Sequence, residues 1–463
     1  MEKAKKKKLA PPHVLAILLV LIVVISILSF IAPTGQYDYV TDALGNSVLD
    51  AESYHPVPRN PVTFAYIINL IPRGFASNIT TIVFVLFCLG SFSVVGKTKA
   101  VDALVNTLLK KLHGKDNVVI ILLSTLFTAC GAFFGWSVES GVFVPMGVLI
   151  AKRMGYDKYL GTAMVIMPTL VGWGTGLLYS GSTLLLQEML GIAPLSGMGY
   201  RAVSLVVLYI LCTALLCLEG DRQRKRRTAS TTTDAKEEED FDDSDLEFTT
   251  RRKLIVAWFV LAIIFMVYAT TVWGWGLSYV GGIYFIMGLG TAILDGQSIN
   301  QMCQSIADGV TEYTFIALVL AFAQSVILLL QETFLMDPFV HLLATLLQSV
   351  PLPLVGVIAF LVVALMTFFM GGFQTKAVIL APILGSLSQL LGFNPQVIVL
   401  AMVFGDGIAK WFWPASSNCV IVVAAGKLEY VDWAKSILKN YLVYLAIAMA
   451  VLIAIMQTFN IGW

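Results

Sequence analysis

Ionisable side chains interrupt the apolar stretches of this 463-residue chain at a few places, and Glu139, Lys376, Asp406 and Lys410 stand deepest within them. A charged group inside hydrocarbon is costly, so such a residue marks a substrate or ion path unless it pairs with another charge. The chemistry that these four residues predict is recognition of a charged solute or ion.

Two pairings of these residues are possible from their positions. Glu139 and Lys376 occupy equivalent places in two related segments. They either form a structural ion pair, or clamp a substrate that bears amino and carboxylate groups, with Lys376 alone able to neutralise an anion. Asp406 and Lys410 are spaced i, i+4 and could neutralise each other across one helical turn. Asp406 also lies between two glycines, which suits a cation site or a bend, and we name it the candidate ion-coupling residue.

Hydroxyl and amide side chains cluster beside glycine-rich interruptions of the apolar runs. Backbone inside a bilayer must satisfy its own hydrogen bonds, so helix breaks survive where they line a polar cavity. The free N–H and C=O groups at such breaks attract anions and cations respectively. The alternative is that the hydroxyls satisfy neighbouring helix carbonyls. With Glu139 and Lys376, the predicted substrate-binding residues are Ser137, Thr175, Ser180, Ser182, Thr183, Gln374, Thr375, Ser416, Ser417 and Asn418.

Composition places the chain in a membrane. It is 58% hydrophobic and 13% charged, whereas a soluble domain has about a quarter charged residues. The net charge of +1 gives no reason to expect a nucleic-acid partner. No nucleophile–base or metal-ligand constellation is evident, so we expect no enzyme, no catalytic residue, no metal site and no cofactor, with Na⁺ or H⁺ as possible coupling ions.

The apolar runs predict an all-α membrane protein with two related halves, 1–220 and 254–463. Each half contains a re-entrant hairpin (117–153 and 353–391) and a broken helix (158–190 and 395–426). The breaks are expected at Gly172–Gly176 and from Gly405–Gly407 through Pro414. The two halves match at a constant offset of 237 residues. Between them, the charged stretch 221–253 predicts a disordered linker.

Lysine and arginine mark cytoplasmic loops. With both hairpins re-entrant the chain crosses about nine times, and 25 of its 30 Lys and Arg residues fall on one side, together with the N-terminus and the linker. Five crossings separate equivalent points of the halves, so the repeats are inverted. Inverted repeats with paired interrupted segments indicate a transporter whose site lies at the repeat interface. A channel would suit continuous pore helices instead.

The chain resembles the YfcC-type branch of the C4-dicarboxylate anaerobic carrier family, within the ion transporter superfamily. Glu139 lies in one of the matching stretches, which are Gly135–Pro145, Leu190–Leu195, Phe404–Gly407 with Trp413 and Pro414, and Gly426–Trp433. The resemblance implies a homodimeric carrier in the cell membrane with scaffold and transport subdomains and an elevator-type movement. It also implies a dicarboxylate, amino acid or peptide-like substrate, moved by alternating access.

This sequence departs from the family at two places that face substrate. Relatives carry Ser-Gly-Ser-Gly-Gln at the second hairpin tip, where this chain reads Gly372-Phe-Gln-Thr-Lys376, and Ser180–Thr183 replaces a Ser/Thr-x-Asn-Pro stretch. Lys376 is thus a fixed cation that could replace a mobile coupling cation. This favours, as the alternative function, a sodium-independent exchanger or uniporter of amino acids.

Overall fold

The computed structural model of the protein describes residues 14–461 apart from 42–46, 50–52, 113–114, 178–179, 194, 230–246, 339–340, 343–344, 346–349, 352–353 and 371. Over these residues the chain is almost entirely helical, which confirms the predicted all-α class. Two short antiparallel ribbons lie in the loop after the first helix. One pairs β1 (Gly35–Gln36) with β4 (His55–Pro56), and the other pairs β2 (Tyr39–Thr41) with β3 (Ser47–Leu49).

The helices before residue 230 are α1 (Val14–Ile31), α2 (Phe64–Ser77), α3 (Ile79–Lys97), α4 (Ala100–Leu112), α5 (Asp116–Phe134), α6 (Val138–Gly141), α7 (Val144–Arg153), α8 (Lys158–Thr175), the π-helical turn η1 (Ser180–Leu184), α9 (Leu185–Met189) and α10 (Met198–Ala229). After residue 246 they are α11 (Thr250–Val272), α12 (Leu277–Leu294), α13 (Ile299–Glu332), α15 (Val355–Phe369), α16 (Phe373–Leu391), α17 (Gln396–Ala409), α18 (Ser417–Ala425), α19 (Tyr430–Ile437), the π-helical turn η4 (Leu438–Leu442) and α20 (Val443–Phe459).

Several of these helices have the length and apolarity of membrane spans. About 20 apolar residues cover the hydrocarbon core of a bilayer. Within the described part of the chain, seven segments meet this requirement: Ile79–Lys97, Asp116–Phe134, Met198–Arg226, Thr250–Thr270, Leu277–Leu294, Ile299–Glu332 and Tyr430–Phe459. Large apolar side chains such as Ile210, Leu261 and Ile447 are more than half exposed on these helices. Such surfaces suit contact with lipid.

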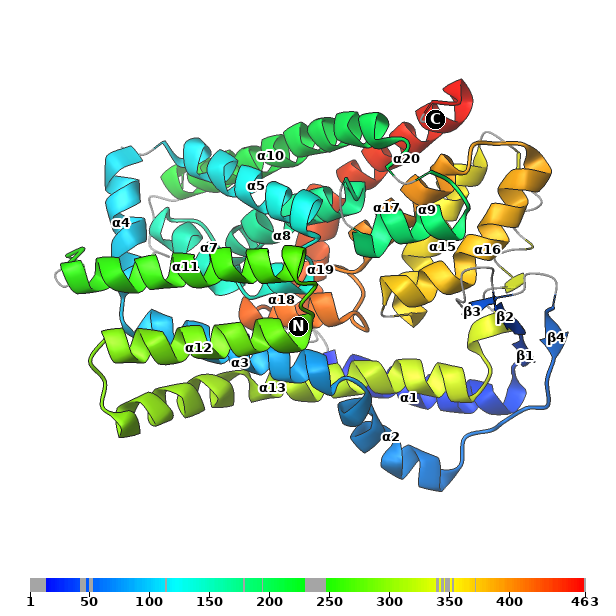
Figure 1. Cartoon of the computed structure of the whole chain (residues 1–463), viewed down its shortest axis with the longest axis horizontal. Coiled ribbons are helices and arrows are strands. Elements are labelled where there is room, and N and C mark those ends of the chain that lie inside the picture. Colours follow the sequence, from blue (N-terminus) through cyan, green and yellow to red (C-terminus); the bar gives the residue numbers. More distant parts are fainter. Residues whose placement is uncertain are drawn as a thin grey trace, which may run out of the picture.

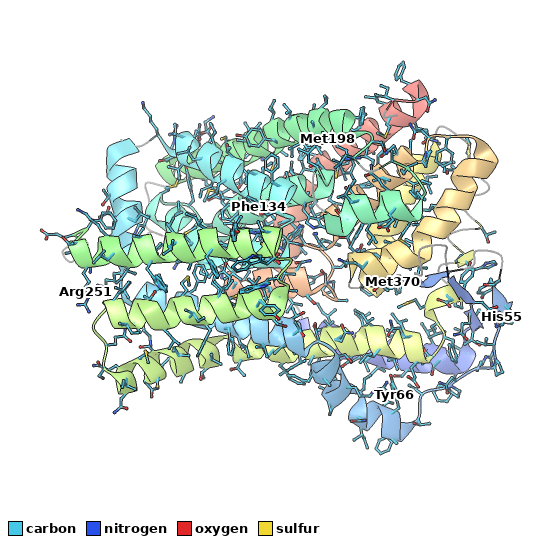
Figure 2. All side chains as sticks on the ribbon, in the orientation of Figure 1. His55, Tyr66, Phe134, Met198, Arg251 and Met370 are labelled. Atoms are coloured by element: carbon cyan, nitrogen blue, oxygen red, sulfur yellow. The ribbon has the colours of Figure 1, made fainter. Side chains whose placement is uncertain are left out.

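The helices form groups that meet in the middle of the molecule (Figure 1). One group packs α3 against α12 and α13, with α1 and α2 along α13. In another, α8 packs against α5, α7 and α10 and also reaches α17, which packs on α15. Figure 1 shows α5, α7 and α8 approaching the centre from one end, and α15, α16 and α17 from the other. Phe134, at the end of α5, and Met370, just after α15, both lie toward the middle in Figure 2.

Close helix crossings explain the glycines that we expected to break helices. α8 continues through Gly172 to Thr175, and α17 continues through Gly405 and Gly407 to Ala409. A Cβ at Gly172 would overlap the carbonyl oxygen of Thr128 on α5, and one at Gly407 would lie 3.0 Å from the Cα of Gly174. α8 ends at Thr175 and α17 ends at Ala409, so both breaks fall within the predicted intervals but after their first glycines. These glycines let backbones approach closely, as small residues do between membrane helices.

The breaks follow directly after these crossings. Gly176 has a left-handed φ of +53° and ends α8, and residues 410–416 separate α17 from α18. Gly135 likewise ends α5 with a φ of +66°. The absence of a Cβ makes this backbone conformation accessible to glycine. The hairpin segments 117–153 and 353–391 correspond to α5–α7 and α15–α16, whose re-entrant placement stays a prediction.

Both ends of the predicted linker belong to helices. Residues 221–229 continue α10, and residues 250–253 begin α11, so both ends of the expected 221–253 segment are helical. Ion pairs one turn apart support the extension of α10, since Arg222 lies 3.4 Å from Glu219 and Arg224 lies 3.9 Å from Asp221. Residues 230–246 and the basic N-terminal stretch before residue 14 lie outside the described residues.

Candidate functional site

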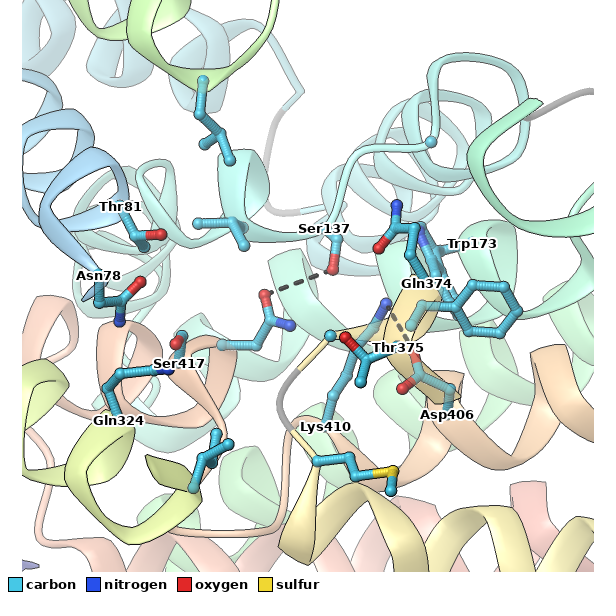
Figure 3. Close-up of a pocket in the computed structure, with 18 of the residues that line it drawn as sticks. Asn78, Thr81, Ser137, Trp173, Gln324, Gln374, Thr375, Asp406, Lys410 and Ser417 are labelled. Atoms are coloured by element: carbon cyan, nitrogen blue, oxygen red, sulfur yellow. Dashed lines mark hydrogen bonds and ion pairs between the residues drawn. The ribbon is translucent and has the colours of Figure 1, made fainter. Parts of the chain in front are cut away.

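A polar pocket of about 420 Å³ lies where the interrupted helices meet (Figure 3). The breaks between α5 and α6, between α15 and α16, and between α17 and α18 all contribute to its wall. Its lining consists of Asn78, Thr81, Gly135, Ser137, Val138, Glu139, Trp173, Leu277, Gln324, Ile327, Gln331, Met336, Met370, Gly372, Phe373, Gln374, Thr375, Asp406, Lys410, Ser417 and Asn418. Residues from both sequence halves thus surround one cavity.

Two lysines share one carboxylate at the floor of the pocket. The Nζ of Lys376 forms an ion pair with Asp406, and the Nζ of Lys410 lies 3.7 Å from Oδ2 of the same residue. The side chains are 0%, 4% and 4% exposed for Lys376, Asp406 and Lys410. With both lysines protonated, this trio carries one net positive charge. A buried charge of this kind calls for a further anion nearby.

Lys410 reaches this position over an aromatic ring. Its Nζ lies 3.0 Å from the centroid of the Trp173 ring, an arrangement in which the face of the indole attracts the cation. Trp173 belongs to α8, in the first half of the chain, and Lys410 follows α17 in the second. The predicted i, i+4 pairing of Asp406 with Lys410 is present. Asp406 lies inside α17, which is helical from Gln396 to Ala409.

Glu139 lies on the pocket wall apart from this trio. Its carboxylate accepts a hydrogen bond of 2.9 Å from the backbone N–H of Ser137, at the start of the short helix α6. Lys376 pairs with Asp406 instead, so the predicted direct ion pair between Glu139 and Lys376 is wrong. Glu139 and Lys376 are therefore equivalent in sequence but do not pair with each other in the structure. Glu139 and Lys410 nevertheless both line the cavity, so the cavity presents both an acidic and a basic side chain.

The predicted hydroxyl and amide residues divide into two sets. Those that line the pocket are Ser137, Gln374, Thr375, Ser417 and Asn418, alongside Glu139 and Asp406. The hydroxyl of Ser137 donates a 3.3 Å hydrogen bond to Oδ1 of Asn418, which links the first hairpin segment to the second broken helix (Figure 3). This bond is a direct contact between the two halves at the pocket.

The other predicted residues lie buried behind the wall. Thr175 and Thr183 donate to the carbonyls of Gly172 (2.9 Å) and Gly176 (2.7 Å), as the structural alternative expected. Lys376 and Ser416 are buried beneath the lining. The hydroxyl of Ser182 is buried and finds no partner among the described residues. The side chain of Ser180 lies outside the part of the chain that the structure describes.

Several lining residues were missed from the sequence. Asn78 and Thr81 flank the start of α3, and Gln324 and Gln331 lie on α13, away from the predicted hairpins and broken helices. A polar amide inside an apolar helix was the available signal, because such groups face the bundle interior rather than lipid. Trp173 carried no such signal, since an indole in an apolar run is ordinarily part of the core.

Known proteins with similar sequences indicate the family of this chain. The chain matches the sequence model of the C4-dicarboxylate anaerobic carrier family over residues 12–457. It belongs to this family. The match covers nearly the whole chain, and together with the apolar helices it establishes a multi-pass membrane protein of a transporter family.

Two bacterial proteins are similar in sequence to about three quarters of this chain. The Escherichia coli K12 protein named "Putative basic amino acid antiporter YfcC" is 26% identical over 372 residues, which cover 76% of this chain and 73% of that protein. An uncharacterized Haemophilus influenzae protein is 21% identical over 385 residues, covering 79% and 73%. The first of these confirms the resemblance to YfcC inferred from the motifs.

Solved structures give a weaker likeness. MtrF of Neisseria gonorrhoeae, from a class of antimetabolite efflux pumps, aligns with a TM-score of 0.46 and 14% identity over 98% of this chain and 96% of that one. The YdaH transporter of Alcanivorax borkumensis aligns with a TM-score of 0.44 and 16% identity over 97% and 99%.

Proposed function

We propose that this family member is a secondary carrier that binds a small carboxylate-bearing solute in the central pocket and moves it across the membrane by alternating access. The observation that carries the proposal is the convergence of interrupted helices from both halves on one polar cavity. In membrane proteins, irregular backbone is tolerated where it lines such a cavity, and discontinuous helices form the substrate sites of carriers.

The charges of the pocket support a carboxylate as the recognised group. Lys410 shares its only described carboxylate, Asp406, with Lys376, so its ammonium group is placed to pair directly with a substrate carboxylate. The first turns of α16 and α18 begin at the pocket, and their N-cap residues make no side-chain capping bond. Helix N-termini of this kind attract anions. Glu139, on the wall, suits an amino group of the same solute.

Size and family narrow the substrate. A cavity near 420 Å³ is at the small end of ligand sites, which run from about 300 to 1,000 Å³. The family description names C4-dicarboxylates, and the Escherichia coli relative is named for basic amino acids. We propose a dicarboxylate, an amino acid or a similarly small peptide-like solute for this chain.

The mechanism we propose is an elevator-type movement of a homodimer in the cell membrane. It supposes two inverted halves, nine crossings and a cytoplasmic N-terminus and linker. The opposite approach of α5 and α15 toward the centre supports inversion (Figure 1), as does the division of Lys and Arg residues along the sequence. Rigid movement of one group of helices against another would then expose the pocket to either side in turn.

Ligand binding to purified protein tests this proposal. Thermal unfolding is measured with dicarboxylates, amino acids and small peptides, first on the wild type and then on Lys410→Gln. We expect a stabilising ligand whose affinity falls about 10- to 100-fold in the variant, since hydrogen bonds to charged groups contribute about 1.5–3 kcal/mol. Lys97→Gln, at a surface ion pair with Asp308, is the matched control and should bind normally.

Counterflow in proteoliposomes separates a carrier from a channel. A carrier loaded with unlabelled solute accumulates labelled solute transiently and saturably, whereas a channel equilibrates it. A ligand whose affinity is the same in Lys410→Gln and wild type would refute the site, and monotonic equilibration without overshoot would refute the mechanism.

A further inference from the structure

The ammonium group of Lys376 is enclosed by oxygen atoms. Besides its ion pair with Asp406, Nζ donates hydrogen bonds of 3.1 Å to Oγ1 of Thr367 and 3.1 Å to the main-chain oxygen of Met370. The Lys376 side chain is 0% exposed. A lysine ammonium has three N–H donors, and these acceptors match them in number. Lys376 therefore has no donor left for a solute, in contrast to Lys410 on the pocket wall.

The acceptors around Lys376 are those of a cation site. A carboxylate, a hydroxyl and a carbonyl are the oxygen ligands that hard metal cations take in proteins. Met370 is the C-cap residue of α15, directly before the break, so its carbonyl lies at the partly negative end of a helix. In carriers with discontinuous helices, unwound carbonyls and helix C-terminal ends coordinate the coupling ion.

We propose that Lys376 is a resident cation, which fills a monovalent-cation site between α15, α16 and α17 through its covalent tether. The ammonium supplies the charge that a mobile Na⁺ would supply, and it neutralises Asp406 while Lys410 stays available at the pocket. The consequence for transport rests on the proposed carrier function: substrate binds without a mobile cation at this position, and no ion flux is coupled there.

Removal of the tethered charge should open the site to a free cation. Purified wild type, Lys376→Ala, Lys376→Ala with Asp406→Asn, and Lys97→Ala are unfolded thermally in NaCl, KCl or choline chloride at equal ionic strength. We expect Lys376→Ala to melt below wild type in choline and to regain a few degrees, saturably, with Na⁺ or K⁺, because a ligand of the native state stabilises it. Wild type, the double variant and Lys97→Ala should not respond.

In Lys376→Ala, the ammonium group of Lys410 could move into the emptied site, because its Nζ already lies 3.7 Å from Asp406. A second variant controls for this. In Lys376→Ala with Lys410→Met both ammonium groups are gone, so the response to Na⁺ or K⁺ should be larger than in the single variant. Size-exclusion profiles show which variants are folded. If neither variant responds, or if wild type shows a saturable Na⁺ or K⁺ response, the proposal is overturned.

This experiment uses the cations alone, so its result does not depend on the substrate or on transport. Uptake in proteoliposomes then tests the consequence. Wild-type uptake should be equal with Na⁺ or choline outside, and Lys376→Ala should require Na⁺ or K⁺. A cation response in Lys376→Ala without any uptake in wild type would uphold the cation site while refuting the proposed carrier function.

Discussion

Removal of the carboxylate of Asp406 should destabilise the protein more than removal of any surface acid. Asp406 is 4% exposed and lies against two ammonium groups, one in direct ion-pair contact and one at 3.7 Å. Two unit charges about 4 Å apart attract by about 4 kcal/mol at an effective dielectric constant near 20. Breaking a buried pair from one side costs about 3–5 kcal/mol, because an uncompensated charge remains. We expect a loss of this size in Asp406→Asn.

The pair between Arg73 and Glu332 offers a matched control. Its nitrogen–oxygen distance is also 3.7 Å, but both side chains are 42% exposed. Exposed pairs contribute about 0–1 kcal/mol, so Glu332→Gln should change stability little. The free energy of unfolding is measured by SDS titration in mixed micelles, with thermal midpoints as a second readout.

A double variant separates lost charge balance from lost packing. In Asp406→Asn with Lys376→Met, one stranded ammonium is removed together with the carboxylate, so part of the loss should be recovered. If Asp406→Asn costs no more than Glu332→Gln, or if the added Lys376→Met deepens the loss, the reading of this trio as a buried charge network is refuted.

Three further results are expected. Gly172→Ala should destabilise by about 1–3 kcal/mol, because its Cβ would overlap the Thr128 carbonyl, whereas Gly174→Ala, with 3.5 Å to its nearest neighbour, should be tolerated in the same unfolding assay. Glu139→Gln should weaken amino-bearing ligands about 10-fold or more and spare dicarboxylates in ligand titrations. Burial raises the pKa of Tyr37 from 10.0 to about 12, so the native state keeps the phenol proton to a higher pH than the unfolded chain does. The free energy of unfolding should therefore fall as the pH rises from 10 to 12. Tyr37→Phe should reduce this fall in a pH series of thermal midpoints.

The sequence predicted which segments build the site because the relevant signals are local. Interrupted apolar runs and charges within them identify helix ends and costly groups without any knowledge of their neighbours. The hairpin segments and the second broken helix accordingly contribute seven of the predicted residues to the pocket lining. The polar residues of α3 and α13 were missed because the predicted site was limited to buried charges and to polar residues beside glycine-rich interruptions.

Partner choice and the exact residue at which each helix ends could not be predicted in the same way, because both depend on packing between distant segments. Symmetry placed Glu139 and Lys376 at equivalent points, yet α15 packs on α17 and brings Lys376 to Asp406. Similarly, a glycine in a helical run can end the helix or close a crossing. Gly172 does the second and Gly176 the first, and the position of α5 decides between them.

The charges of the site also constrain which solutes can move without an accompanying ion. When all four groups are ionised, Lys376 and Lys410 balance Asp406 and Glu139, so the empty pocket is neutral. A zwitterionic amino acid leaves this balance unchanged, whereas a dicarboxylate adds two negative charges to a poorly solvated site, at a cost that rises with burial. Exchange of one dicarboxylate for another avoids a net movement of charge. The ammonium group of Lys376 is covalently attached, so it cannot be released as a co-transported cation that would compensate the charge of the substrate. We therefore expect that zwitterion uptake is insensitive to a potassium diffusion potential set with valinomycin, and that dicarboxylate uptake requires dicarboxylate inside the vesicle. Potential-driven dicarboxylate uptake into empty vesicles would contradict this charge balance.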